Sequence, residues 1–241
     1  MQALAAFVLA SALLGAIGPA LVCGAGVRET GPGHLTSIVE IIESFPLGIE
    51  PTHRASGVLI TPKYVLSTKE AAGKPGITKR RHVVVGRSAG GEGVAVEIDY
   101  KASPEHPDGL ILLKLQEDVN LDAVTKAANL PHGNTDNTGA SALLASWGST
   151  KDKLQSSTVN VLTKAECVKK GVKEGLLCSA DKGKGACGGD EGSPIVQDLK
   201  NGVYKLVGIV TGAQDVKTCL ETTAYFDVAK YSSWILDKVY G

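Results

Sequence analysis

The hydrophobic and polar residues of this chain follow two different periods. Through most of its length, short runs rich in β-branched residues are separated by Gly, Pro, Ser or Lys turns, which is typical of β-strands. The first half contains such runs at residues 37–45, 55–60, 64–67, 82–85, 94–100 and 110–115. Near the end, helical spacing predicts a closing amphipathic helix, with Val228, Tyr231, Trp234, Ile235 and Lys238 on one side. The pattern therefore predicts a mainly β protein.

The beginning of the chain differs from the rest. An apolar run rich in Leu and Ala extends from Leu4 to Gly15, and small residues follow at Gly24 and Ala25. This arrangement is typical of a secretory signal peptide. A transmembrane anchor is the alternative, but the run is shorter than the roughly 20 residues that a span requires. We therefore expect residues 1–25 to direct secretion.

Composition narrows the class of protein further. Lysines plus arginines number 25, aspartates plus glutamates also number 25, and 43% of the 241 residues are hydrophobic. A chain of this size can bury a sizeable core, and its neutral charge favours neither nucleic acid nor an anionic membrane as a partner. The five cysteines would leave one thiol free in an oxidising compartment. Removal of Cys23 with the signal peptide resolves the odd number.

Several motifs occur in the order and at the spacing of one known family. Residues 58–71 resemble a strand and turn ending in T-A-A-H-C, residues 109–115 resemble D-I-A-L-L-K-L, and residues 189–194 resemble G-D-S-G-G-P. Weaker matches lie at residues 145–150, 206–210 and 228–235. The chain thus resembles the chymotrypsin/trypsin (S1) serine proteases, and in particular the inactive, secreted homologues of arthropods.

This resemblance implies an all-β fold of two six-stranded antiparallel Greek-key barrels with a C-terminal helix. The first barrel is expected at about residues 35–117, the second at about residues 140–228 and the helix at about residues 229–239. Two-barrel proteases of this length form one compact unit, so residues 26–241 are expected to be a single domain.

The resemblance also places a substitution at each position of the catalytic triad. Glu70 stands where the family has histidine, Gly109 where it has aspartate and Glu191 where it has serine. A carboxylate attacking an amide is a weak nucleophile that forms a labile anhydride, and Glu70 has no hydroxyl to deprotonate. Glu191 can also fold its own oxygen onto the backbone N–H of Gly189, an oxyanion-hole donor in the family. We therefore expect no protease activity.

The specificity pocket that the resemblance implies is degenerate as well. Gly185 lies at its base, so the acidic residue that receives Lys or Arg in trypsin is missing, and Thr223 replaces a wall glycine. The strand that pairs with substrate reads Thr211-Gly212-Ala213 where the family has S-W-G. Cleavage and peptide docking are both expected to be impaired.

The resemblance assigns the remaining cysteines to family disulfides. The expected pairs are Cys167–Cys178 and Cys187–Cys219. A third family disulfide has lost both ends together, because its two positions correspond to Ala55 and Ala71. Because both cysteines are absent, no unpaired thiol remains at this site, which indicates a stable protein lineage.

Activation of the family requires a new N-terminal amine, which pairs with the aspartate before the nucleophile. That aspartate corresponds to Asp190, but no I-V-G-G motif occurs in the chain. Gly26-Val27, released by cleavage of the signal peptide, is the candidate for this pairing.

Glu70 and Glu191 are expected to adjoin and to repel each other, with Lys69 as the nearest candidate cation. A bridging metal ion and a glycosidase-like acid/base pair are two alternatives. A calcium site needs a third clear ligand and nothing else supports glycoside chemistry, so no metal or cofactor is expected. The scattered histidines are assigned structural or surface roles: His34, His53, His82, His106 and His132.

These observations predict a secreted, non-catalytic serine protease homologue that acts by binding proteins. The resemblance implies a scaffold or cofactor in an extracellular proteolytic or innate immune process of body fluid such as haemolymph. Its partners are expected to be proteases or inhibitors of a cascade, with no nucleic acid or membrane, and the protein is expected to be a monomer. The alternatives are a hydrolase with altered chemistry using Glu70 and Glu191, and an abundant structural or storage-like secreted protein.

Overall fold

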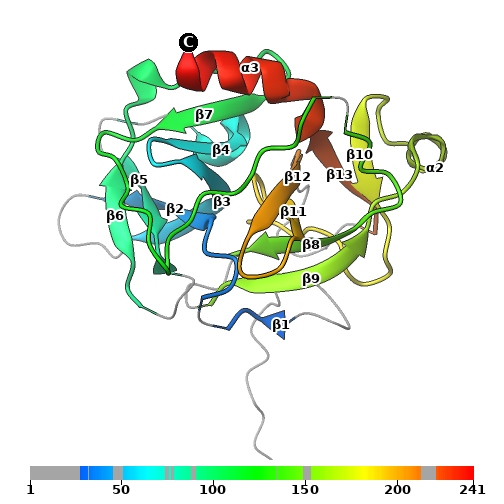
Figure 1. Cartoon of the computed structure of the whole chain (residues 1–241), viewed down its shortest axis with the longest axis horizontal. Coiled ribbons are helices and arrows are strands. Elements are labelled where there is room, and N and C mark those ends of the chain that lie inside the picture. The colour runs from blue at the N-terminus through cyan, green and yellow to red at the C-terminus, as the bar shows by residue number, and fades with distance from the viewer. Residues whose placement is uncertain are drawn as a thin grey trace, which may run out of the picture.

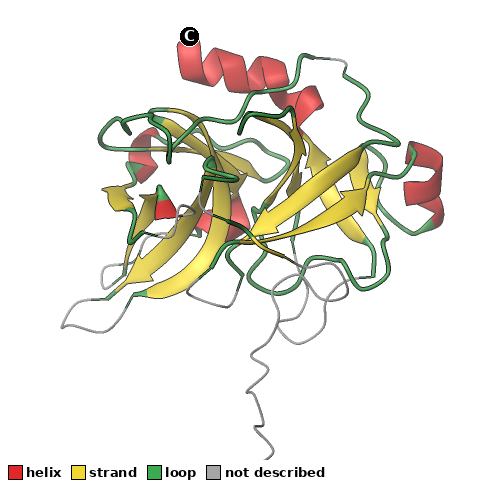
Figure 2. Cartoon of the chain, turned by 60° about the horizontal axis from the view of Figure 1, so that its bottom comes forward, coloured by secondary structure: helices red, strands yellow, loops and turns green. Residues whose placement is uncertain are grey.

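Two antiparallel β-sheets lie side by side in the computed structural model of this chain (Figures 1 and 2). The structure describes residues 28–31, 33–45, 51–73, 76, 79–87, 91–133, 135–148, 153–212 and 221–241. Residues 1–25, the predicted signal peptide, lie outside the described residues. In the described part of the chain, no helix has the length and apolar character needed to cross a membrane.

The first sheet has six strands in the order β6-β5-β2-β3-β4-β7. An isolated bridge between Ile98 and Leu115 joins the ends of the outer strands and closes the sheet toward a barrel. The strands confirm the predicted runs: β2 (Ile38–Ser44), β3 (Thr52–Thr61), β4 (Tyr64–Thr68), β5 (Arg80–Val85), β6 (Val94–Glu97) and β7 (Leu110–Lys114).

One predicted strand, at residues 94–100, is too long. Strand β6 ends at Glu97, and the 3-10 helix η2 (Tyr100–Ala102) follows. The cause is local, because the Asp99 side chain accepts a hydrogen bond from Ala102 N at 3.2 Å and so caps this turn.

The second sheet has seven strands in the order β1-β9-β8-β11-β12-β13-β10. A bridge between Val161 and Ser179 joins the ends of β9 and β10. The two-residue β1 was not predicted, since so short a segment carries no apolar period; it pairs with the edge of β9. The strands are β1 (Arg28–Glu29), β8 (Ser141–Ser146), β9 (Gln155–Asn160), β10 (Leu176–Ser179), β11 (Pro194–Asp198), β12 (Tyr204–Val210) and β13 (Thr223–Asp227).

Three α-helices occur among the described residues: α1 (Lys69–Ala72), α2 (Lys164–Lys169) and α3 (Val228–Tyr240). Helix α3 confirms the predicted closing helix. Helix α2 was missed because it is too short to show an apolar period, although Thr163 and Glu166 form a capping box that signals a helix start.

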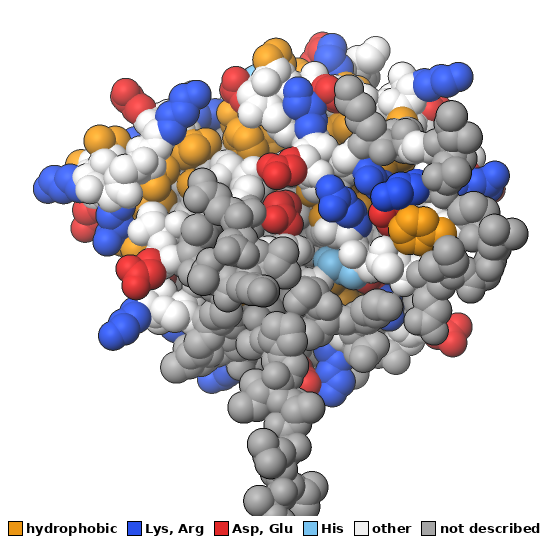
Figure 3. Space-filling model, turned by 180° about the vertical axis from the view of Figure 1, so that it is seen from behind, with side chains coloured by type: hydrophobic (Ala, Val, Ile, Leu, Met, Phe, Trp, Pro, Cys, Tyr) orange, Lys and Arg blue, Asp and Glu red, His pale blue; other side chains and the backbone are white. Residues whose placement is uncertain are grey.

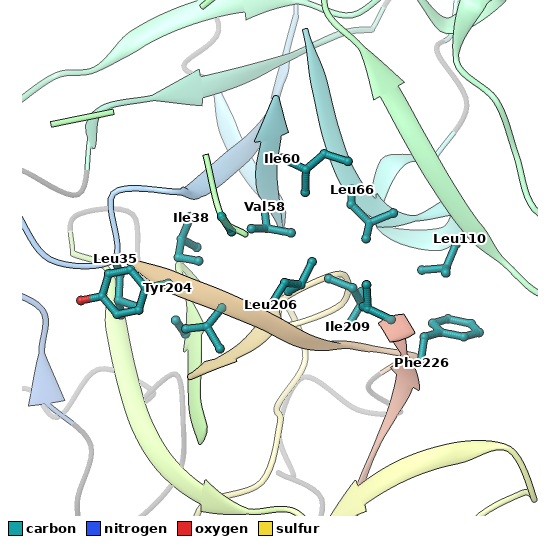
Figure 4. Close-up of a cluster of buried hydrophobic side chains, with 14 of the residues drawn as sticks. Leu35, Ile38, Val58, Ile60, Leu66, Leu110, Tyr204, Leu206, Ile209 and Phe226 are labelled. Carbon is teal, nitrogen blue, oxygen red and sulfur yellow. The ribbon is translucent and has the colours of Figure 1, made fainter. Parts of the chain in front are cut away.

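The core explains why the two barrels form one unit. One cluster fills the first barrel and another fills the second. A third cluster lies between the sheets, where Val58 and Leu66 face Leu206 and Ile209 (Figure 4). Strand β3 is therefore buried on both faces, with Leu59 inside the first barrel and Val58 at this junction. A strand with no solvent-facing side accounts for the continuous hydrophobic run in the sequence.

The predicted disulfide Cys167–Cys178 is confirmed. Cys187 is also disulfide-bonded, and its predicted partner, Cys219, lies outside the described residues. Ala55 and Ala71 are both buried in the first-barrel core. The space of the missing family disulfide is thus filled by apolar packing.

Candidate functional site

The loops between the two barrels bring the predicted site residues together. A hollow of about 280 Å³ is lined by Glu70 and Glu191, with His53, Arg54, Ala71, Gly188 and Gly189 completing its wall. Gly109 lies next to it in the fold, because Lys69 N donates to Gly109 O at 2.8 Å. Figure 3 shows a face of the molecule on which acidic side chains adjoin basic ones and a histidine.

Helix α1 positions Glu70 at the mouth of this hollow. The Thr68 hydroxyl caps the helix by accepting from Ala71 N at 3.2 Å. At the other end, the Tyr100 hydroxyl and the Arg81 guanidinium both donate to Ala72 O. Because Ala71 and Ala72 are buried, Glu70 is left on the exposed side of the single turn.

The turn that carries Glu191 keeps a tight backbone that requires glycine. Gly192 has φ +74°, and a Cβ there would lie 2.6 Å from Ser56 O. Gly189 has φ +95°. An L-residue is strained at such angles, so this turn is built for glycine at both positions.

Glu191 folds back onto this turn, as the sequence led us to expect. Its Oε2 accepts a hydrogen bond from Gly189 N at 3.0 Å. In the family resemblance, that N–H belongs to the oxyanion hole, which stabilises charge developing on a substrate oxygen. The Glu191 carboxylate therefore occupies the backbone donor that the resemblance assigns to that hole.

The backbone geometry at position 109 favours glycine. Gly109 has φ +117°, and a Cβ at this position would lie 3.4 Å from Phe226 Cζ. An aspartate there would be strained whatever the space around it. The backbone conformation at position 109 therefore favours glycine over aspartate.

Lys69, the cation expected near the carboxylate pair, forms its ion pair with Glu105. Lys69 Nζ lies 3.6 Å from Glu105 Oε2, because the side chain turns toward the loop before β7. Arg54 lines the hollow instead. Glu70 forms no ion pair with any residue that the structure describes.

His53 is a residue of this site whose position the sequence did not reveal. Its Nδ1 lies 3.0 Å from Glu40 Oε1, its Nε2 lies 3.4 Å from Gly189 O, and its side chain is buried. Arg87 binds the other oxygen of Glu40. Only the pairing of β2 with β3 brings His53 and Glu40 together, which no local pattern signals.

Asp190 is buried beneath the Glu191 turn. Its Oδ2 accepts from Cys187 N at 2.7 Å, whereas Oδ1 has no hydrogen-bond partner in the described part of the chain. Burial raises the pKa of Asp190 to about 7. The candidate N-terminus, Gly26-Val27, lies outside the described residues, so its pairing with Asp190 stays a prediction.

Thr223, which the resemblance places at the expected specificity pocket, is tied to the segment beside Gly185. This residue is buried, and its Oγ1 accepts a hydrogen bond from Ala186 N at 2.8 Å. Thr211 bonds to Ala224 O through both its backbone N–H and its hydroxyl. The Thr223 hydroxyl thus links β13 to the segment before Cys187.

Glu70 also reaches the segment that follows β12. A Cβ built on Gly212 would lie 3.4 Å from Glu70 Oε2. Ala213, which the resemblance also assigned to the degenerate pocket, lies outside the described residues. The Glu70 carboxylate therefore lies close to the backbone of Gly212.

The structure groups no metal-ligand set at this site. Across the ranges that it describes, no three His, Cys, Asp or Glu side chains come together in a group able to hold a metal ion. Glu70 and Glu191 are two carboxylates, and calcium takes six to eight oxygen ligands.

The fold and these motifs agree with the family to which the chain belongs. The Trypsin family model matches residues 40–235, so the chain is a member of the trypsin family. Among curated proteins it is similar to trypsin delta, trypsin gamma and trypsin alpha of Drosophila melanogaster, each 29% identical over 140 residues. The match covers 53% of this chain and 52–53% of those proteins. The chain thus spans about half the length of the curated relatives it matches.

Proposed function

We propose that this protein is a secreted serine protease homologue that does not cut peptides and acts by binding other proteins. The observation that carries the proposal is the hydrogen bond from Gly189 N to Glu191 Oε2. It places a carboxylate at the nucleophile position and on an oxyanion donor at once. Both the attacking group and part of the charge-stabilising group of the family mechanism are then missing.

The sizes of the expected rate losses support the absence of protease activity rather than weak activity. Loss of a serine protease triad costs on the order of 10⁶ in kcat, and loss of one oxyanion donor costs about 10² to 10³. Glu70 has no hydroxyl to activate, and the backbone of Gly109 disfavours an aspartate. Because each part of the machinery is altered, no single change restores it.

A binding role accounts for a folded protein with a closed site. Trypsin-family proteins are typically secreted, and the confirmed disulfide fits an oxidising compartment. We place the protein outside the cell, in an extracellular proteolytic or innate immune process such as one in haemolymph. In this proposal it acts as a monomeric scaffold or cofactor for proteases or inhibitors and uses no metal or cofactor.

A hydrolase of altered chemistry is the second candidate, because Glu70 and Glu191 line the same hollow. Paired carboxylates are the groups that glycoside hydrolysis uses. This candidate requires that Glu191 leave Gly189 N before it can act on a substrate.

The deciding experiment combines a fluorophosphonate active-site probe with a broad panel of peptide and glycoside substrates. We expect the mature protein to remain unlabelled and to turn over no substrate. The matched control carries Glu70→His and Glu191→Ser, made with and without Gly109→Asp because that position favours glycine. Turnover by the native protein that Glu191→Ala abolishes would replace the binding proposal with the hydrolase.

A further inference from the structure

A lysine-rich groove lies beside α2 and shares no residue with the hollow of Glu70 and Glu191. It has a volume of about 940 Å³ and is bounded by α2, the loop that follows, the start of β10 and one residue of α3. Four lysines line it: Lys164, Lys169, Lys173 and Lys230. Figure 1 shows α2 at the periphery of the molecule, beside β10. Although the whole chain is neutral, this groove concentrates positive charge.

The lysines of the groove have acidic neighbours, because Glu166 and Asp227 both lie close enough to feel their charge, but the lysines form no ion pair with them in the part of the chain that the structure describes. Among the ion pairs of the described residues, none involves a lysine that lines the groove. Glu166, the acid of α2, accepts hydrogen bonds from the backbone N–H and the hydroxyl of Thr163. Glu174 lines the groove but makes no ion pair there. Lys230 donates to Gly175 O at 2.6 Å, which holds one cation at the edge.

The groove also has apolar lining residues, and a disulfide connects two of the elements that bound it. Val168 is 54% exposed, and Leu176 lies half-buried beside it. The disulfide Cys167–Cys178 attaches α2 to β10, so both walls are already in place. A ligand that binds such a preorganised surface does not have to order it first.

We propose that this groove binds an acidic peptide segment of a partner protein, in which carboxylates flank an apolar side chain. The carboxylates pair with the lysine rim, and the apolar side chain covers Val168. A sulfated polysaccharide would meet the lysines but leave Val168 facing water, so the surface favours a peptide. The inference rests on the proposed binding function and gives it a partner chemistry.

The test is a fluorescence anisotropy titration of the mature protein with a short labelled peptide of Asp and Glu around a central Leu. Lys173→Glu is expected to weaken binding about tenfold. Lys101→Glu, the same charge change at an exposed lysine of η2 in the first barrel, is expected to stay within about twofold. Val168→Ser should weaken the Leu peptide about threefold and leave a peptide with Ser in place of Leu unaffected.

Three results would overturn the assignment. Equal losses for Lys173→Glu and Lys101→Glu, or no binding at all, would exclude a defined peptide groove. Tighter binding of dextran sulfate, unchanged by Val168→Ser, would assign the surface to a polysaccharide. The two proposals fail separately. Protease activity would contradict the proposed function without altering this titration. A negative titration would exclude the peptide groove and would not bear on the absence of protease activity.

Discussion

The two barrels hold their site-bearing helices in different ways. In the second barrel, the disulfide Cys167–Cys178 ties α2 to β10. In the first barrel, α1 is anchored by Arg81, which donates to Ala72 O and pairs with Glu43 Oε1 at 2.9 Å. The side chains of Glu43 and Arg81 are only 10% and 8% exposed.

The buried ion pair of the first barrel lies beside the helix to which the resemblance assigns an absent disulfide. Ala71, one of the two positions that resemblance assigns to the missing disulfide, lies within α1. Burial raises the pKa of Glu43, but the hydrogen bonds and charges of Arg81 and Lys79 outweigh it and lower that pKa overall. The first barrel therefore relies on charges where the second relies on a covalent bond.

The largest expected effect concerns Asp190, the buried charge at the base of the Glu191 turn. Its folded pKa of about 7 exceeds the ordinary value of 3.8, so the folded state binds the proton more tightly. The contribution of Asp190 to the free energy of unfolding is fully present below pH ~4 and is lost as the pH rises through ~7. The whole change is about 4 kcal/mol. Denaturant unfolding from pH 5 to pH 8 should show about 3 kcal/mol of this loss in the native protein and none of it in Asp190→Asn. Equal slopes for the two proteins would show that the protonation of Asp190 does not change on unfolding in this pH range.

The second-largest effect is expected from breaking the Arg81–Glu43 ion pair of the first barrel. Arg81→Ala should lower the free energy of unfolding by about 3 kcal/mol, because it leaves Glu43 buried without its main partner. Lys79→Ala is the matched control, since its side chain is 49% exposed and should cost less than about 1 kcal/mol. Urea unfolding at neutral pH measures both. Similar losses of unfolding free energy in the two variants would show that the burial of Arg81 adds nothing to stability.

Removing the covalent anchor of the second barrel should have a smaller effect. Cys167→Ser with Cys178→Ser opens a link of sequence separation 11 and should cost about 2–3 kcal/mol. The same variant should weaken acidic-peptide binding, because α2 loses its attachment to β10. Unchanged peptide affinity in the folded variant would mean that the disulfide does not hold the groove.

The smallest effect compares the caps of the two short helices. Thr163→Ala removes the capping box of α2 and should cost about 1 kcal/mol. Thr68→Ala removes the cap of α1 and should cost at least as much, since Thr68 is buried and Thr163 is exposed. Thermal unfolding ranks the pair. The reverse order would show that Arg81 holds α1 without its cap.

The sequence predicted much of the fold because strands and the last helix depend on local periods. Six runs in the first barrel, the closing helix and the disulfide Cys167–Cys178 are all confirmed. The short elements β1 and α2 were missed, since two or six residues carry too little period to detect. The overlong prediction at residues 94–100 failed because an aspartate side chain started a turn within an apolar run.

The candidate site was likewise predicted only in part from the sequence. From the sequence, the family resemblance assigns Glu70, Gly109 and Glu191 to the triad positions, which stays a prediction. The reach of a glutamate side chain led to the contact between Glu191 and Gly189, which the structure contains. Only the tertiary structure decided that Lys69 pairs with Glu105, that His53 meets Glu40, and that the backbone at position 109 favours glycine. The physical reason is that residue types and periods are local properties. Ion pairs, backbone angles and side-chain contacts arise where distant segments pack together.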